Sequence, residues 1–212
     1  MNNKKKLIIS KAYDLGFETV GFTEPKISLI DQNNLTKFLE NNLFGHMKWL
    51  ERHAIKKKNP KKLWSKVKTV IVLGLNYAPE INPLNKNLFK NNANISVYAS
   101  NEDYHNVIKK KLFFLQEWLE SELNIESKYF VDSAPVFEKP LAQNSGVGWQ
   151  GKHTNLVSKK FGSWLFLCEI FLPIKLDYDK KEIDHCGSCG DCIDICPTNA
   201  FLNSHRIDAR KC

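Results

Sequence analysis

The sequence predicts an α/β domain followed by a small cysteine-rich module. Segments with helix and strand patterns alternate along the first 175 residues. Five of the six cysteines lie within the last 27 residues, after a charged linker near Pro173 to Asp184. We therefore assign residues 1–175 to the α/β domain and residues 176–212 to the second module.

Three segments have the periodicity of helices. They are Lys4 to Leu15, Leu35 to Arg52 and Asp103 to Leu123. Apolar side chains of the third recur along one helical face, with charged side chains off it. The second is interrupted near Gly45, because glycine is a weak helix former.

Five segments are predicted to be strands: Phe17 to Phe22, Thr69 to Leu75, Ile95 to Ala99, Ser127 to Val131 and Trp164 to Leu172. The β-branched run from Thr69 to Leu75 is typical of a strand buried on both faces, and Trp164 to Leu172 of a central strand. Cys168 lies inside that apolar segment, so we expect it to pack in the core. The Asn- and Lys-rich stretch from Asn82 to Asn94 predicts a surface loop.

Composition narrows the class of protein. The chain has 212 residues, of which 42% are hydrophobic and 25% charged, enough to bury a full core. No segment reaches the roughly 20 apolar residues of a membrane span, and the N-terminus lacks a signal-peptide pattern, so we expect a cytoplasmic protein. The net charge is +8, and the basic residues are most concentrated from Arg52 to Lys68. This charge is compatible with a polyanionic partner, and the alternative is that the lysines only keep the surface solvated.

The cysteine spacing carries the strongest chemical signal. Four cysteines follow the pattern C-x2-C-x2-C-x3-C-P: Cys186, Cys189, Cys192 and Cys196. Bacterial ferredoxins bind 4Fe–4S clusters with this spacing, and the fourth cysteine ligates a different cluster in two-cluster proteins. Zinc is the alternative, but zinc sites usually consist of two separated ligand pairs. The pattern therefore favours electron transfer.

Three further segments are specific: Tyr98 to His105, Val131 to Ala142 and Gly146 to His153. Asp132 ends the strand in the second, at the type of position where open α/β sheets place functional groups. The same aspartate could instead cap the following turn. The glycine-rich third segment is ambiguous by itself, because a lone G-x-G-x-x-G is weak evidence for a dinucleotide site.

The order of these motifs, with Gly45 to Leu50 before them and Ile207 to Cys212 after them, strongly resembles the epoxyqueuosine reductase family. The resemblance covers nearly the whole chain. It implies a cobalamin-binding, reductive-dehalogenase-like α/β domain and a partial ferredoxin-like module. The implied reaction reduces the epoxide of epoxyqueuosine at the tRNA wobble position, the last step of queuosine biosynthesis.

The resemblance also implies roles for particular residues. Asp132 matches the proton donor. Cys186, Cys189 and Cys192 match ligands of one 4Fe–4S cluster, and Cys196 and Cys212 match ligands of the other. Five residues lie in segments expected to approach cobalamin or substrate: Tyr104, His105, Gly148, Lys152 and His153. The implied partners are tRNA and a flavodoxin- or ferredoxin-type electron donor, and we expect a monomer without membrane contact.

The chain departs from the family pattern at its C-terminus. Family members continue past the position of Cys212 into a second cysteine group and a helical repeat region. We therefore expect this chain to be truncated, with incomplete ligand sets for two clusters and poor activity alone. Two other interpretations remain open at this point. One is an iron–sulfur electron carrier, and the other is a dehalogenase-like enzyme acting on a small molecule.

Overall fold

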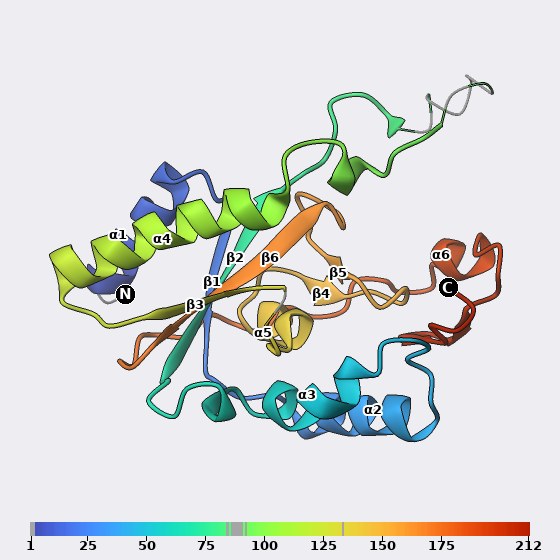
Figure 1. Ribbon diagram of the computed structural model, residues 1–212, viewed down its shortest axis with the longest axis horizontal. Helices are drawn as coiled ribbons and strands as arrows, with labels where there is room; N and C mark the ends of the chain where they lie inside the picture. Colours follow the sequence, from blue (N-terminus) through green and yellow to red (C-terminus); the bar gives the residue numbers. More distant parts are fainter. Residues whose placement is uncertain (1–2, 84, 86–90, 92, 133) are drawn as a thin grey trace.

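A four-stranded antiparallel sheet forms the centre of the protein (Figure 1). The computed structural model describes residues 3–83, 85, 91, 93–132 and 134–212. The strand order is β1-β2-β6-β3, and the bounds are Thr19–Thr23, Thr69–Asn76, Leu165–Leu172 and Lys128–Val131, respectively. The predicted strands at 17–22, 69–75, 127–131 and 164–172 are thus confirmed. β6 pairs on both sides, as expected of a central strand.

Two helices cover one face of this sheet. Figure 1 shows α1 (Asn3–Asp14) and α4 (Tyr104–Leu123) together on that face, and both helices were expected from the sequence. The apolar stripe of α4 is fully buried: Ile108, Leu112, Leu115 and Leu119. Cys168 packs in the same cluster, as predicted, and its burial raises the pKa of the thiol well above the usual value. The expectation that Cys168 packs in the core is therefore confirmed.

A second apolar layer covers the opposite face. There α5 (Glu138–Asn144) packs through Leu141 and Ala142 on Val70 and Val72 of β2. Because both faces are covered, β2 is buried from Thr69 to Gly74 even though its neighbours are antiparallel. The rule for sites at the ends of parallel strands, which drew attention to Asp132, does not describe this sheet.

Gly21 permits the close packing of α5 on the sheet. The register aligns Gly21 with Val72 on β2, and Val72 in turn with Glu169 on β6. A Cβ atom at Gly21 would collide with the backbone carbonyl of Ser145 at the end of α5. Any larger residue would therefore push α5 away from the sheet.

The predicted helix at 35–52 is two helices. α2 spans Leu29–Glu40 and α3 spans Trp49–Lys58, with a short 3₁₀ helix, η1, at Pro60–Lys62. The expected interruption is present, and Gly45 has a φ of +58° within it. α2 begins earlier than predicted because Ser28 caps it, accepting a hydrogen bond from the Asp31 amide at 3.1 Å.

The predicted strand at 95–99 is wrong. Val97–Ala99 forms a 3₁₀ helix, η3, and Ile95 and Tyr98 are 64% and 54% exposed. β-branched and aromatic residues favour strands by packing beside a neighbouring strand, and this segment has none in the described structure. The predicted loop at 82–94 lies largely outside the described residues.

The C-terminal segment packs beside the α2–α3 region (Figure 1). It contains α6 (Asp191–Asp194) and a small hairpin of β7 (Phe201–Asn203) and β8 (Arg206–Ile207). A second short pair, β4 (Trp149–Gln150) with β5 (Leu156–Val157), precedes β6. The division at residue 175 stays a prediction. Among the described residues, no helix is long and apolar enough to cross a membrane.

Candidate active site

Three predicted site residues meet where β3 ends. The Tyr104 hydroxyl donates a hydrogen bond to Oδ2 of Asp132, and Nε2 of His105 lies 3.5 Å from the same oxygen. Asp132 has a φ of +37°, which is uncommon for a residue with a side chain. Its side chain is 57% exposed, so the carboxyl group is oriented by neighbours and still open to a reactant.

The first turn of α4 fixes the two partners of Asp132. Asp103 caps this helix, accepting a hydrogen bond at Oδ1 from the His105 amide at 2.9 Å and contacting His105 Nδ1 at 2.8 Å. The Tyr104 ring stacks between His105 and Phe166, with centroid distances of 4.0 Å to each. Burial, and then Asp132, raise the pKa of Tyr104, so its hydroxyl keeps its proton. It acts here as a donor.

A group of buried charges lies behind Asp132. The Asp132 amide donates a hydrogen bond to Oε1 of Glu138 at 3.0 Å. Glu169, aligned with Phe130 on β3 and Val72 on β2, is fully buried, and neither of its carboxylate oxygens has a hydrogen-bond partner within the described structure. The Lys57 amine donates to the Val136 carbonyl at 2.9 Å and is the cation next to both glutamates.

Burial dominates the ionisation of this group. It raises the pKa of Glu138 to about 7, with a further contribution from Asp132. Burial, and then Glu138, raise the pKa of Glu169 well above its usual value, whereas burial lowers the pKa of Lys57. A buried carboxyl group without a hydrogen bond is most stable in its neutral form. Burial therefore favours the protonated forms of Glu138 and Glu169 near Asp132.

A cavity of 660 Å³ adjoins Glu138. Two of the three segments singled out in the sequence line this cavity. Val136 to Lys139 belong to the segment 131–142, and Gln150 and Gly151 belong to the segment 146–153. α2, the β7–β8 hairpin and two residues of α3, Leu50 and Lys57, also contribute to the lining. A volume of this size is typical of small-molecule and cofactor sites.

Lys139 joins the cavity to the glycine-rich segment. Its amine donates to the Thr154 carbonyl at 2.9 Å and to Oδ1 of Asn155 at 3.0 Å. His153 lies in the same turn; its Nδ1 accepts from the Asn155 amide at 3.1 Å, and burial lowers its pKa. Gly148 is buried, and a Cβ atom there would collide with the Val157 carbonyl. Glycine at 148 thus allows β4 and β5 to approach each other.

Lys152 points to the cysteine loop. Its amine donates to the carbonyls of Gly187 at 2.8 Å and Cys189 at 2.6 Å. Its own carbonyl accepts a hydrogen bond from the His205 amide at 3.0 Å. The predicted cofactor residues therefore do not meet at one place. Tyr104 and His105 contact Asp132, whereas Lys152 contacts the cysteine-rich segment.

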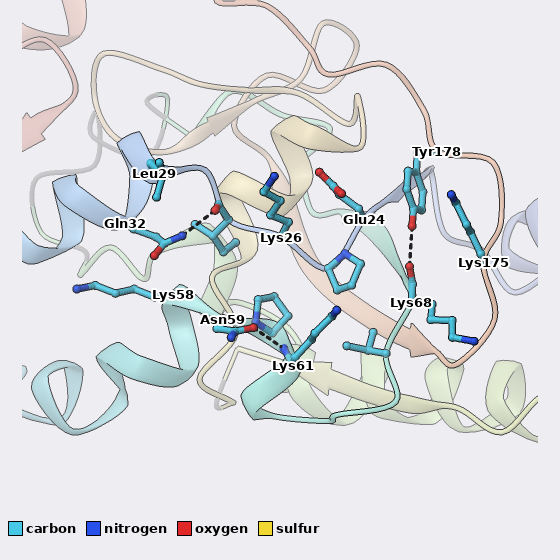
Figure 2. Close-up of a pocket in the computed structure, with 14 residues that line it drawn as sticks. Glu24, Lys26, Leu29, Gln32, Lys58, Asn59, Lys61, Lys68, Lys175 and Tyr178 are labelled. Carbon is cyan, nitrogen blue, oxygen red and sulfur yellow. Dashed lines mark hydrogen bonds between the residues drawn. The ribbon is translucent and has the colours of Figure 1, made fainter.

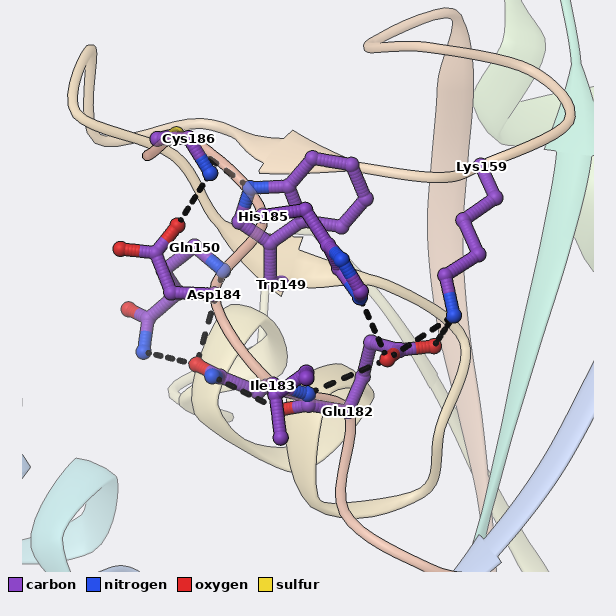
Figure 3. A network of polar contacts seen from close by, with 9 residues as sticks. Trp149, Gln150, Lys159, Glu182, Ile183, Asp184, His185 and Cys186 are labelled. Carbon is purple, nitrogen blue, oxygen red and sulfur yellow. Dashed lines mark hydrogen bonds and ion pairs between the residues drawn. The ribbon is translucent and has the colours of Figure 1, made fainter. Parts of the chain in front are cut away.

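A polar network surrounds Cys186 (Figure 3). The indole Nε1 of Trp149 donates to Sγ of Cys186 at 3.3 Å, and the Cys186 amide donates to Oδ1 of Asp184 at 2.8 Å. His185 packs edge-on against Trp149 and contacts Glu182 at 2.9 Å. A hydrogen bond to sulfur stabilises the negative charge of a thiolate, the form that binds metal.

The cysteine-rich segment suits an iron–sulfur cluster by its donor set. All five of its cysteines are free; Cys186 and Cys189 lie on one loop, and Cys192 lies in α6 directly after it. Sγ of Cys196 accepts a hydrogen bond from the Ala200 amide at 3.4 Å. N–H groups directed at ligand sulfurs are among the features that set cluster potentials. Within the described residues, no three His, Cys, Asp or Glu side chains converge on a single metal ion.

Known proteins resemble this chain along its whole length. The family model "Epoxyqueuosine reductase QueG, DUF1730" matches residues 57–133. An epoxyqueuosine reductase of Cellulophaga algicola is 41% identical over 216 residues, covering all of this chain and 69% of that protein. This chain belongs to the epoxyqueuosine reductase family. The family is one of oxidoreductases, and the resemblance inferred from the motif order is confirmed.

Solved structures of epoxyqueuosine reductases share the fold. One, crystallised with an epoxyqueuosine-modified tRNA-Tyr stem loop, has a TM-score of 0.84 and 25% identity, covering 99% of this chain and 56% of that one. A reductive dehalogenase is more distant, with a TM-score of 0.53, 12% identity and coverage of 93% of this chain and 23% of that one. The expected reductive-dehalogenase-like α/β fold is thus confirmed. The chain spans little more than half of that reductase structure.

Sequence reasoning did not assign four residues of the candidate site: Lys57, Glu138, Lys139 and Glu169. Glu138 and Lys139 were part of a recognised motif but received no role. Glu169 carried a usable signal, because a carboxylate inside an apolar strand is either paired or functional. Lys57 carried no usable sequence signal, because it is one of many lysines between Arg52 and Lys68.

Proposed function

We propose that this chain contains the active site of an epoxyqueuosine reductase, with Asp132 as the proton donor. Family membership supports the reaction class, and a relative of this fold was crystallised with an epoxyqueuosine-modified tRNA stem loop. The observation that carries the assignment is the position of Asp132. Its carboxyl group is exposed, oriented by Tyr104, and next to buried acids that hold protons at neutral pH.

The chemistry requires protons at a defined place. Removing an epoxide oxygen as water consumes two electrons and two protons. Asp132 donates a proton to the departing oxygen, and such general acid catalysis typically contributes about 10²–10⁴-fold. After the transfer, the Tyr104 hydroxyl stabilises the carboxylate through its hydrogen bond. Glu138, whose pKa burial raises to about 7 and which accepts a hydrogen bond from the Asp132 amide, can supply the next proton.

The proposal includes two kinds of cofactor. Cobalamin, implied by the family, supplies a reduced metal centre that can deliver two electrons. The cavity beside Glu138 suits part of such a cofactor in size, and Lys139, Gln150 and Gly151 would hold it. The cysteine residues assigned from the sequence would hold 4Fe–4S clusters: Cys186, Cys189, Cys192, Cys196 and Cys212.

The proposed partners follow from the reaction. The substrate is tRNA carrying epoxyqueuosine at the wobble position, whose base must leave its stack to reach Asp132. A flavodoxin- or ferredoxin-type protein supplies electrons. We place the protein in the cytoplasm, because free cysteines of this density persist in a reducing compartment, and we propose that it acts as a monomer.

A single-turnover assay tests the function. The protein, purified anaerobically with cobalamin and reconstituted clusters, is mixed with an epoxyqueuosine-containing tRNA stem loop and a chemical reductant. We expect slow but detectable conversion to queuosine, in line with the poor activity expected from the sequence, and we expect Asp132→Asn to lose about 10²–10⁴-fold in rate while keeping its corrin absorption.

The matched control is Asp14→Asn, at an exposed aspartate that ends α1. It should react like the wild type. Corrin binding and stem-loop binding without any conversion would contradict the proposed activity. Conversion by Asp132→Asn at the wild-type rate would contradict the role of Asp132 alone.

A further inference from the structure

A second cavity lies at the other end of the sheet from Asp132. It has a volume of 510 Å³ and adjoins the end of β1, the start of β2 and the segment after β6 (Figure 2). Thr69, at the start of β2, pairs with Leu172, whereas Val131 beside Asp132 pairs with Cys168. Four residues of β6 separate these levels, or about 13 Å along the strand. The second cavity is therefore distinct from the active site.

Lysines dominate its lining. Five are present, from four separate segments: Lys26, Lys58, Lys61, Lys68 and Lys175. Glu24 is the only carboxylate among the described residues of the lining, so the formal charge of the lining is +4. None of the five makes an ion pair within the described part of the chain. Four of them are exposed, and Lys58 is half-buried and donates to the Thr36 hydroxyl at 2.6 Å.

The rest of the lining is apolar and aromatic. Pro25, Ile27, Pro60 and Val67 contribute apolar surface between the lysines. Tyr178 is 38% exposed, and its hydroxyl donates to the Lys68 carbonyl at 2.8 Å, which fixes the ring at the rim (Figure 2). Cations beside a fixed aromatic ring are the combination that binds a nucleotide of a single strand, by phosphate contact and by base stacking.

We propose that this cavity binds a nucleotide of the tRNA other than the one that reacts at Asp132. The lysines contact backbone phosphate, and Tyr178 contacts the base or ribose. The inference rests on the proposed function, which makes RNA the substrate. It assigns the cavity a positioning role, because phosphate contacts fix the register of a nucleic acid without reading its sequence.

Equilibrium binding of the substrate tRNA to the full chain, between 50 and 200 mM salt, tests the inference. The test variant replaces Lys61, Lys68 and Lys175 by Gln. We expect at least tenfold weaker binding at low salt and a log–log salt slope reduced by roughly 0.7 to 0.9 for each phosphate that is no longer neutralised. The triple Arg variant at the same positions should retain binding.

The matched control replaces three exposed lysines outside the cavity, Lys109, Lys110 and Lys181, by Gln. It should leave affinity and slope unchanged. Tyr178→Leu should weaken binding by about fivefold or more, and Tyr178→Phe, which keeps the ring, should not. Thermal unfolding of each variant verifies that the fold is retained.

The outcomes separate the two proposals. If the wild type does not bind tRNA, the proposed function fails. If it binds tRNA and the cavity and control variants weaken binding equally, the inference is overturned and only net charge matters. Binding of AMP or pyrophosphate that depends on Lys61 and Lys68, with tRNA affinity unchanged in the test variant, would overturn the RNA assignment in favour of a small phosphorylated ligand.

Discussion

The hydroxyl of Tyr104 donates a hydrogen bond to Oδ2 of Asp132, from the first turn of α4 to the residue after β3. Tyr104→Phe removes this donor and keeps the ring stacked on Phe166. We expect about tenfold slower single turnover, because a hydrogen bond to a charged group contributes roughly 1.5–3 kcal/mol. Corrin absorption should match that of the wild type. Turnover at the wild-type rate would show that Asp132 needs no donor.

Glu138 should make stability depend on pH. Its pKa is raised from 4.5 to about 7 in the folded protein. The folded state therefore binds this proton more tightly than the unfolded chain, and its contribution to stability is fully present below pH 4.5 and declines as the pH rises toward 7. We expect the free energy of unfolding, relative to Glu138→Gln, to fall by about 1–3 kcal/mol over this range.

Denaturant titrations at several pH values measure this difference. Glu120→Gln, at an exposed glutamate on α4, is the matched control and should show the pH dependence of the wild type. If Glu138→Gln changes stability equally at pH 4.5 and 7, the carboxyl group is not perturbed by its surroundings.

Lys57 should contribute to the stability of the folded protein and not to RNA binding. Its amine faces Glu138 and the Val136 carbonyl, unlike the other lysines of the basic stretch. Lys57→Met leaves buried groups without their partner, so we expect a loss of about 1–3 kcal/mol in the free energy of unfolding. Lys56→Met, at its exposed neighbour, should change stability by less than about 0.5 kcal/mol. Equal effects would place Lys57 on the solvated surface.

Trp149 should tune a cluster bound through Cys186. Its indole N–H donates to the sulfur at 3.3 Å, and hydrogen bonds to ligand sulfurs favour the reduced, more negative cluster. Trp149→Phe should therefore lower the reduction potential of this cluster. An anaerobic redox titration followed by electron paramagnetic resonance measures that potential. Trp49→Phe, at an exposed tryptophan on α3, is the control. An unchanged potential would show that the indole does not donate to the sulfur once iron is bound.

The sequence predicted the sheet well and the charged site poorly, for a physical reason. Periodicity identifies which strand residues are buried, so β2 and β6 were found with their central positions. It does not identify which charges face each other across elements. Glu169, Glu138 and Lys57 come from β6, α5 and α3, and only the folded chain brings them together. Asp132 was found through its motif, because its strand-end position alone also suited a turn cap.

Lys152 holds the cysteine-rich segment, which we propose carries the clusters, in one position. Its amine and carbonyl make three hydrogen bonds to the cysteine-rich segment, at Gly187, Cys189 and His205. A redox module that moves between docking positions needs a flexible connection to the rest of the protein. These hydrogen bonds instead hold the module in place. We therefore expect electron delivery over a fixed gap, with a rate governed by driving force and insensitive to solvent viscosity.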